Sequence, residues 1–184
     1  MTQHTTFYGP VTDKVWQKAQ QIRLLICDVD GVFSDGRIYM GNQGEELKAF
    51  HTRDGFGIKA LLSCNIQVAV ITGRKSQIVE RRMTSLGIQH IYQGIDNKLT
   101  AYHELLDVYQ LNPEQVAYIG DDMVDLPVMQ QVGLGVCVAD GHPQVKQLAD
   151  FVTSIGGGFG AVRELADLLL LSQNLLDSAH GMSV

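Results

Sequence analysis

An apolar run ends at two acidic residues separated by a single residue in Leu24-Leu25-Ile26-Cys27-Asp28-Val29-Asp30-Gly31-Val32. An uninterrupted apolar strand is typical of a parallel sheet that is buried on both faces. The Asp-Gly pair that follows favours a turn. The chain is therefore predicted to present Asp28 and Asp30 where a buried strand comes to the surface.

The same alternation of short apolar runs and amphipathic segments continues along the chain. It predicts an α/β fold, Rossmann-like and doubly wound, with a mostly parallel sheet, helices on both faces and a single domain over residues 1–184. Further strands are expected at residues 66–71, 88–92, 116–119, 135–138 and 151–152, and helices at 54–63, 75–86, 96–110 and after Pro143.

Three further segments carry structural expectations. Residues 1–9 are expected to form a loose start before a helix that begins near Pro10 and runs to Gln21. Residues 36–50 are expected to form a protruding β-hairpin around Gly41-Asn42-Gln43-Gly44. The run Gly156-Gly157-Gly158-Phe159-Gly160 is expected to be locally flexible before a C-terminal helix and tail over about 160–184.

Composition limits the classes of function. The 184 residues are 45% hydrophobic, enough for a substantial core, and the net charge of −6 offers no broad basic face for nucleic acid or an anionic membrane. The three cysteines occur singly, which favours free thiols in a reducing compartment. With no signal-like or membrane-spanning apolar run, we predict a cytoplasmic protein with a small-molecule partner.

Reactive side chains follow four of the expected strands. Ligands bind beyond the carboxyl ends of the strands in an open parallel sheet. Those ends carry Asp28 with Asp30, Thr72, Lys98, and Asp121 with Asp122. Clustered carboxylates suit Mg²⁺, while a lysine and a hydroxyl can hold phosphoryl oxygens. One carboxylate is then available as a nucleophile and another as a general acid and base.

These residues resemble the four motifs of the haloacid dehalogenase-like hydrolase superfamily. The motifs are Asp28-Val29-Asp30-Gly31-Val32, Thr72-Gly73-Arg74, Lys98 and Gly120-Asp121-Asp122-Met123-Val124-Asp125. The resemblance implies that Asp28 is the aspartyl-phosphate nucleophile and Asp30 the general acid/base. It also implies that Thr72 and Lys98 hold the phosphate. The magnesium ligands it implies are Asp28, Asp121 and the Asp30 backbone carbonyl, with Asp122 and Asp125 as supports.

The short gaps between the motifs leave no room for an independent cap domain. Water exclusion and recognition of the leaving group must then come from elsewhere. We hypothesise that another copy of the chain supplies them, with the 36–50 hairpin packing between subunits. The leucines of the last helix either join such an interface or pack onto the chain's own sheet.

A narrower resemblance covers nearly the whole chain. The segments His51-Thr52-Arg53-Asp54-Gly55-Phe56-Gly57, Tyr92-Gln93-Gly94 and the glycine-rich run before Ala161-Val162-Arg163-Glu164 are similar to the 3-deoxy-D-manno-octulosonate 8-phosphate phosphatase family. This implies a capless, magnesium-dependent homotetramer acting in synthesis of the lipopolysaccharide inner core. The substrate site it implies is formed by Asp30, His51, Thr52, Arg53, Asp54, Gly55, Lys59, Arg74, Arg82 and Lys98.

Several alternatives stay open on the sequence. The chain could be a related capless phosphatase that acts on a nonulosonate 9-phosphate. It could also be a phosphatase domain whose only role is to promote assembly of a sugar-activating enzyme. A phosphoacceptor receiver domain also uses an acidic pocket, a threonine and a lysine. In receivers the phosphorylated aspartate lies on a later strand than the acidic pair, but here the intermediate strand Val70-Ile71-Thr72 ends without an aspartate. A catalytically idle scaffold is disfavoured because Asp28 and Asp30 are both present.

Overall fold

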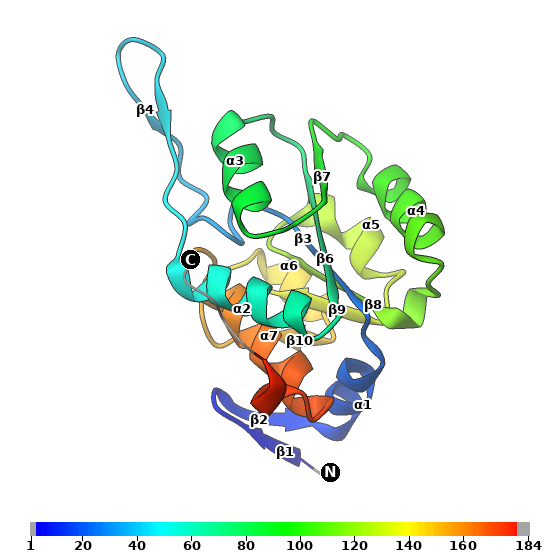
Figure 1. Cartoon of the computed structure of the whole chain (residues 1–184). Helices are drawn as coiled ribbons and strands as arrows, with labels where there is room; N and C mark the ends of the chain where they lie inside the picture. The colour runs from blue at the N-terminus through cyan, green and yellow to red at the C-terminus, as the bar shows by residue number, and fades with distance from the viewer. Residues whose placement is uncertain (1–2, 180–184) are drawn as a thin grey trace.

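A six-stranded parallel sheet forms the centre of the computed structural model, which describes residues 3–179 (Figure 1). Its strand order is β10-β9-β8-β3-β6-β7. The strands are β3 (Leu24–Cys27), β6 (Gln67–Thr72), β7 (His90–Gln93), β8 (Val116–Gly120), β9 (Leu134–Cys137) and β10 (Phe151–Val152). The predicted α/β fold is confirmed, and the strand that carries the acidic pair is central.

The register of β3 with its neighbours fixes where the functional loops meet. Cys27 lies opposite Val70 of β6 and Ile119 of β8, so the three strands end at nearly the same level. The backbone N–H of Asp28 donates to the carbonyl of Ile119 at 3.0 Å and continues the ladder past the last strand residue. Asp28, Thr72 and Asp121 are therefore brought to one edge of the sheet.

Helices cover both faces of the sheet. One face packs against α1 (Asp13–Gln21), α2 (Thr52–Ser63), α3 (Gln77–Ser85) and α7 (Ala161–Ser172), and the other against α4 (Lys98–Tyr109), α5 (Leu126–Met129) and α6 (Pro143–Leu148). Successive β3 residues alternate between the two cores, with Leu25 in the first and Leu24 and Ile26 in the second. Short 3₁₀ turns lie at Pro113–Gln115, Met123–Asp125 and Leu176–Ser178.

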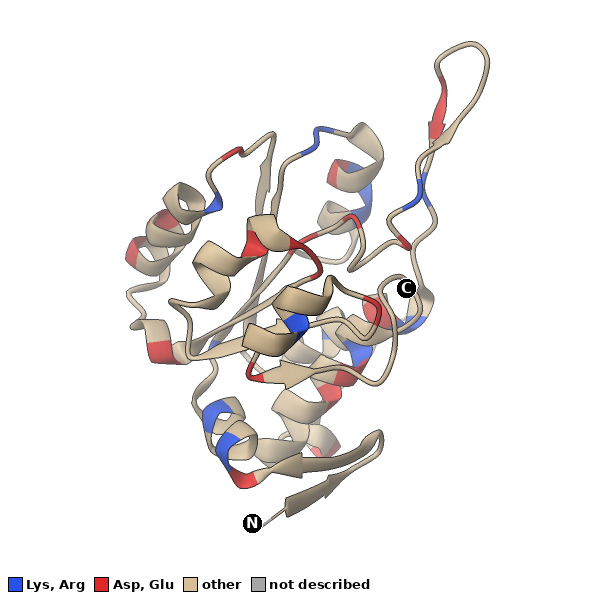
Figure 2. Ribbon diagram, turned by 180° about the vertical axis from the view of Figure 1, so that it is seen from behind, with Lys and Arg blue, Asp and Glu red and all other residues tan. Residues whose placement is uncertain are grey.

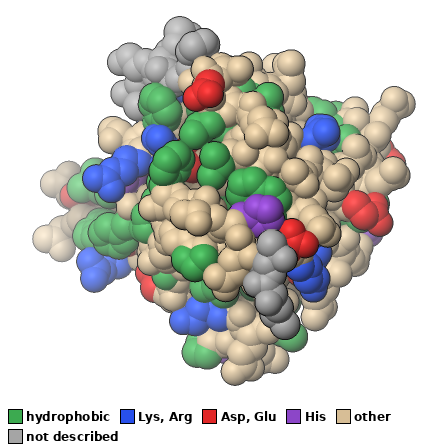
Figure 3. Space-filling model, turned by 90° about the horizontal axis from the view of Figure 1, so that it is seen from below, with side chains coloured by type: hydrophobic (Ala, Val, Ile, Leu, Met, Phe, Trp, Pro, Cys, Tyr) green, Lys and Arg blue, Asp and Glu red, His purple; other side chains and the backbone are tan. Residues whose placement is uncertain are grey.

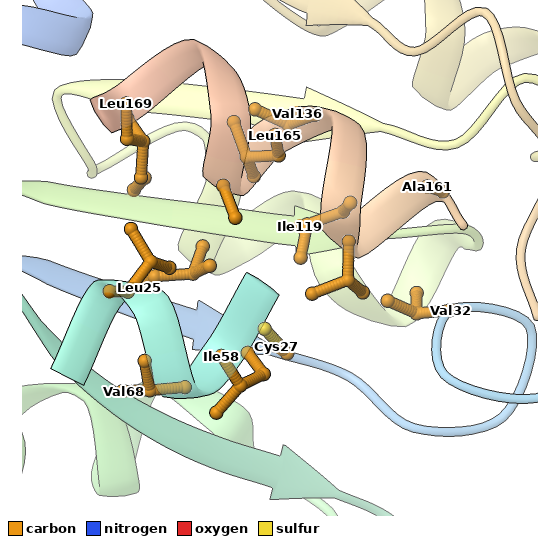
Figure 4. Packing of buried hydrophobic residues seen from close by; sticks show 14 of the residues in the cluster. Leu25, Cys27, Val32, Ile58, Val68, Ile119, Val136, Ala161, Leu165 and Leu169 are labelled. Carbon is orange, nitrogen blue, oxygen red and sulfur yellow. The ribbon is translucent and has the colours of Figure 1, made fainter. Parts of the chain in front are cut away.

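The leucine-rich face of α7 packs inside its own chain. Figure 4 shows Leu165 and Leu169 on the helix above Leu25 and Ile119 of the sheet, with Val136 beside Leu165. Leu165 and Leu169 are completely buried, and α2 lies along the same helix. Of the two roles considered for this helix, packing onto its own sheet is correct, and its apolar face needs no neighbouring subunit.

The N-terminal region differs from the prediction. Instead of a loose start and a helix from Pro10, β1 (Gln3–Thr6) and β2 (Gly9–Thr12) form an antiparallel hairpin before α1. Gly9 has φ 119°, which a residue with a side chain rarely adopts, and Thr6 Oγ1 donates to the Gly9 carbonyl at 2.7 Å. Thr12, not Pro10, caps the helix by accepting from the Val15 N–H.

The predicted β-hairpin projects from the body of the molecule (Figure 1). Its strands β4 (Tyr39–Met40) and β5 (Glu46–Leu47) pair antiparallel, with Tyr39 opposite Leu47. Several of its large apolar side chains are exposed: Ile38 by 49%, Met40 by 73% and Leu47 by 68%. In the part of the chain that the structure describes, no separate cap domain stands over the sheet.

Two of the helices that begin at residues other than those predicted show what sets the boundary. The second helix starts at Thr52, two residues before the expected Asp54, because the His51 ring accepts the Arg53 N–H. The fourth starts at Lys98 and is capped by Asn97, not Asp96, through a bond from the Leu99 N–H to Asn97 Oδ1. In both cases the side chain that accepts the first free N–H sets the boundary.

Surface and thiol features agree with the composition. The end of the molecule seen from below in Figure 3 shows hydrophobic and basic side chains interspersed among polar ones. Cys27, Cys64 and Cys137 are free, as predicted. No helix within residues 3–179 is long and apolar enough to cross a membrane.

Candidate active site

The carboxyl-end edge of the sheet holds a pocket of about 270 Å³. Acidic segments gather on the loops along this edge in Figure 2. The pocket thus brings together Thr72, Arg74 and Lys98 with Asp28 and Asp30. Its lining residues are Asp28, Asp30, Thr72, Gly73, Arg74, Ile95, Asp96, Lys98 and Val124.

Lys98 is the buried cation of the pocket, with 4% of its side chain exposed. Its Nζ lies 2.9 Å from Asp28 Oδ1, 2.7 Å from Asp125 Oδ1 and 3.1 Å from the Tyr118 hydroxyl. Burial alone would lower the pKa of Lys98, but the charges of Asp28 and Asp125 outweigh it and raise that pKa. The ammonium group is therefore charged and fixed in direction by three acceptors.

Two carboxylates at this edge resist ionisation. Burial raises the pKa of Asp28 to about 6, against the opposing charge of Lys98. Burial, followed by the charges of Asp125 and Asp28, raises the pKa of Asp121 to about 7. Both raised pKa values indicate that the positive charge near these two carboxylates is too small to offset their burial and the repulsion from neighbouring carboxylates.

Asp125 organises the loop after β8. Its Oδ1 accepts from Lys98 and from the Tyr118 hydroxyl at 2.6 Å, and its Oδ2 accepts from the Asp121 and Asp122 N–H groups at 2.9 and 3.1 Å. The carboxylate is fully buried. Both of its oxygens are thus occupied by protein donors, which suits a support and not a direct ligand.

The acidic residues fit a hard divalent cation. Asp28, Asp121 and Asp125 each have a carboxylate oxygen within 4.8 Å of the other two. Because the oxygens of Asp125 already accept four protein hydrogen bonds, Asp28 and Asp121 are the carboxylates available as ligands. Exposed Asp122 caps the next turn through its bond from the Met123 N–H at 2.7 Å. A Mg²⁺ ion held there would supply the missing positive charge.

Asp30 lies on the opposite side of the pocket, in a group of alternating charges. Its Oδ1 pairs with Lys48 Nζ, and its Oδ2 lies 3.8 Å from Arg74 Nε. Glu46 Oε1 is 3.2 Å from Arg74 Nη2 and 3.8 Å from Lys48 Nζ. Each oxygen of Asp30 therefore faces a cation from a different loop.

The glycine-rich segment predicted to be flexible packs against the turn over residues 28–32, which carries Asp28 and Asp30, instead. The Gly158 N–H donates to the Val32 carbonyl at 2.8 Å, and the Gly157 N–H donates to Asp140 Oδ1 at 2.8 Å. A Cβ on Gly157 would lie 1.7 Å from the Gly31 carbonyl oxygen. Glycine is required there because two backbone segments touch, so the run constrains the turn that carries Asp30.

Seven predicted substrate residues do not line this pocket within the single chain. They are His51, Thr52, Arg53, Asp54, Gly55, Lys59 and Arg82.

Two of the seven have other positions in the fold. Buried Asp54 accepts the Arg163 N–H at 2.9 Å at the start of α7, and burial raises its pKa to about 6. Lys59 borders a separate cavity of about 520 Å³ with Leu62, Gln67 and Leu86. Their assignment to the substrate site stays a prediction.

The sequence analysis did not identify four polar residues of this site. Glu46 lies on β5 of the hairpin and Lys48 directly follows that strand. Tyr118 lies inside an apolar strand, where it resembles a core residue. Asp96 was expected only as the first residue of a helix over 96–110, yet it borders the pocket. An isolated polar atom within an apolar strand, as in Val116-Ala117-Tyr118-Ile119, is the one signal that could have identified Tyr118.

Comparisons with known proteins agree with this geometry. A family model described as haloacid dehalogenase-like hydrolase matches residues 84–156. A Yersinia pestis protein named 3-deoxy-D-manno-octulosonate 8-phosphate phosphatase KdsC is 62% identical over 179 residues, covering 97% of this chain and 96% of that protein.

Two solved structures extend the comparison. The crystal structure of a 3-deoxy-D-manno-octulosonate 8-phosphate phosphatase from Yersinia pestis superposes with a TM-score of 0.98 at 61% identity, covering 100% of this chain and 99% of that one. The enzyme of the same name from Moraxella catarrhalis, in complex with a magnesium ion, a phosphate ion and KDO, has a TM-score of 0.89 at 43% identity. The match covers 91% of this chain and 97% of that one.

The raised pKa of Asp121 yields a stability prediction. We expect Asp121→Asn to stabilise the metal-free protein at pH 8 by about 1–3 kcal/mol, because the amide removes an unfavourable buried charge. Because the folded carboxyl has a pKa of about 7 and the unfolded one its ordinary value of 3.8, the destabilisation grows as the pH rises between these two values and is complete above about pH 7. The gain from Asp121→Asn should therefore shrink as the pH falls from 7 toward 4.

Thermal unfolding with and without Mg²⁺ tests this expectation. Mg²⁺ should raise the Tm of the wild type but not that of Asp121→Asn, while the exposed control Asp107→Asn should behave as the wild type. A metal-free Asp121→Asn protein that is less stable than the wild type would contradict the electrostatic account.

Tyr118→Phe tests the support of Lys98. The ring packing is retained, but Lys98 loses an acceptor and Asp125 loses a donor, which should cost about 1–2 kcal/mol in urea unfolding. Turnover of p-nitrophenyl phosphate should fall by about 3–10-fold because the ammonium is less firmly directed. Tyr92→Phe, which removes an exposed bond to Glu104, is the control, and equal results for both variants would refute the role of Tyr118.

Proposed function

Because the chain belongs to the family of 3-deoxy-D-manno-octulosonate 8-phosphate phosphatases, within the haloacid dehalogenase-like hydrolases, we propose that it hydrolyses this phosphate ester with Mg²⁺. The products are 3-deoxy-D-manno-octulosonate and inorganic phosphate. The free cysteines suit a reducing compartment, so we place the enzyme in the cytoplasm, in synthesis of the lipopolysaccharide inner core.

One observation carries this proposal at the level of chemistry. Asp28 lies against the fixed ammonium of Lys98, in a pocket that Thr72 also lines. A phosphoryl group placed among these three side chains would have a carboxylate for attack and a cation and a hydroxyl for its oxygens. This division of roles supports Asp28 as the nucleophile.

The metal site is proposed from the acids and from the related structure that contains magnesium. Asp28, Asp121 and the backbone carbonyl of Asp30 would hold the ion, with Asp122 and Asp125 keeping the loop in place. When bound, Mg²⁺ supplies positive charge between the carboxylates and the phosphoryl oxygens.

The first half of the reaction uses both acids of the opening motif. A carboxylate oxygen of Asp28 attacks phosphorus, and the bond between phosphorus and the sugar oxygen breaks. Asp30 gives its proton to that leaving oxygen, so the sugar acid departs as an alcohol. An aspartyl phosphate remains on Asp28, with Thr72 and Lys98 holding its oxygens.

The second half returns the enzyme to its starting state. Asp30, now ionised, takes a proton from water as the water oxygen attacks phosphorus. The bond between phosphorus and the Asp28 oxygen breaks, and inorganic phosphate is released. Asp28 is again a carboxylate, and Asp30 is again protonated.

The sugar acid itself needs walls beyond those of the single chain. The pocket of about 270 Å³ lies below the roughly 300–1,000 Å³ typical of ligand sites, and only Arg74 among the additional cations lines it. We propose that a homotetramer completes the site and brings His51 to Gly55, Lys59 and Arg82 toward substrate. The exposed apolar side chains of the hairpin support this assembly.

Phosphate release from a panel of sugar acid phosphates tests the function. The wild type with Mg²⁺ should prefer the eight-carbon 8-phosphate, and Asp28→Asn should lose at least about 10³-fold in kcat because it lacks the attacking carboxylate. Equal turnover by Asp28→Asn would refute the nucleophile. Preference for a nine-carbon 9-phosphate would overturn the substrate and leave the phosphatase chemistry standing.

Light scattering tests the assembly. The wild type should have the mass of a tetramer, and the double change Met40→Asp with Leu47→Asp should lower the mass and the activity together, since charges replace exposed apolar contacts. Val108→Asp, at a 50% exposed apolar position on α4, should change neither. A monomeric wild type at working concentration would refute the proposal.

A further inference from the structure

Lys48 is a buried cation whose position the proposed reaction does not yet explain. It follows β5 in the segment that returns from the hairpin to α2, and only 1% of its side chain is exposed. It is absent from the residues that line the pocket. A lysine buried to this degree is costly unless it is paired, so its partners indicate its role.

The partners of Lys48 belong to the acid/base side of the pocket. Its Nζ pairs with Asp30 Oδ1 and lies 3.8 Å from Glu46 Oε1. Arg74 faces Asp30 Oδ2 and Glu46 Oε1 from the other side, at 3.8 and 3.2 Å. The four side chains alternate in charge and connect the hairpin, the turn over residues 28–32 and the loop after β6.

Burial separates the two cations that face Asp30. Arg74 is 45% exposed and lines the pocket, so it is free to contact a ligand. Lys48 is enclosed and out of reach of a ligand. Its contact with Asp30 can therefore persist while substrate is bound, whereas a contact from Arg74 would be shared with substrate.

We propose that Lys48 is a positioning residue that orients the Asp30 carboxylate toward the leaving-group oxygen. This inference rests on the proposed phosphatase function. An aspartate side chain turns about two bonds, and a general acid works only within hydrogen-bond reach of the atom it protonates. By fixing Oδ1, Lys48 restricts both rotations and leaves Oδ2 toward the pocket, where Arg74 approaches it.

Leaving-group dependence separates this role from an anchoring role. A sugar alkoxide must be protonated as it departs, whereas p-nitrophenolate leaves without a proton. Misplacing Asp30 should therefore slow an alkyl phosphate much more than an aryl phosphate. A change that only loosens the hairpin or the fold has no reason to distinguish the two substrates.

The experiment compares Lys48→Met, which keeps the apolar stem and removes the charge, with the wild type in the full chain with Mg²⁺. For the sugar acid phosphate, kcat should fall about 10–100-fold with KM within about twofold. For p-nitrophenyl phosphate, kcat should fall less than about threefold. Lys14→Met, at a 76% exposed lysine near Asp150, is the matched control and should match the wild type on both substrates.

Lys48→Arg provides the second variant. It keeps the charge but replaces a point ammonium with a planar fork, so it should lose about 3–10-fold on the sugar acid phosphate alone. If Tm and mass show that Lys48→Met does not fold, Lys48→Arg alone tests the proposal. A partial loss confined to the alkyl substrate supports positioning, and an equal loss on both substrates refutes it.

Other outcomes also overturn the proposal or its premise. A raised KM with unchanged kcat would make Lys48 a substrate contact, and unchanged kinetics in Lys48→Met would show that Asp30 needs no such partner. If the wild type hydrolyses p-nitrophenyl phosphate and simple alkyl phosphates but no sugar acid phosphate, the proposed substrate fails. The Lys48 comparison then proceeds on the alkyl ester that is turned over.

Discussion

The ammonium of Lys98 between Asp28 and Asp125 is the contact on which the rest of the site depends. Parallel strands deliver their C-terminal loops to one edge, so the geometry that gathers the functional groups also gathers several carboxylates in a partly buried place. Lys98 neutralises part of that charge and is held by three acceptors. The pKa of Asp121 nevertheless stays raised, so one fixed cation is insufficient and a divalent ion fits what is missing.

Close backbone contacts constrain the turn over residues 28–32. Gly31 has φ +85°, and a Cβ there would lie 2.2 Å from Asp121 Oδ2, so a side chain would enter the proposed metal site. On its other side, Gly157 touches the Gly31 carbonyl. The turn is thus enclosed between the loop after β8 and the glycine-rich segment, which is held in turn by Asp140. This enclosure limits where the Asp30 carbonyl can point.

The sequence predicted features that local chemistry determines and missed those that depend on distant pairing. The apolar runs ending at Asp28, Thr72 and Asp121 identified the strands and their edge, because burial on both faces leaves a clear pattern. The N-terminal hairpin was missed because its strands are short and Pro10 resembled a helix start. Lys48 was missed because its contact with Asp30 depends on how the hairpin folds back. The run over residues 156–160 was interpreted as flexible because a glycine-rich composition is typical both of flexible segments and of segments whose backbones pack closely.

Ion pairs connect the hairpin to Asp30, the proposed general acid. Glu46 lies on β5 of the hairpin and Lys48 directly follows that strand, and both belong to the charge group around Asp30. If the hairpin packs against another copy of the chain, as proposed, the subunit contact restrains the residues that restrain Asp30. Assembly would then affect proton delivery as well as the walls around the sugar acid. A contact that shifts Glu46 and Lys48 would move the Asp30 carboxylate, which under the proposed mechanism must lie within hydrogen-bond reach of the leaving oxygen. Under that mechanism the hairpin would contribute to the chemistry without touching phosphorus.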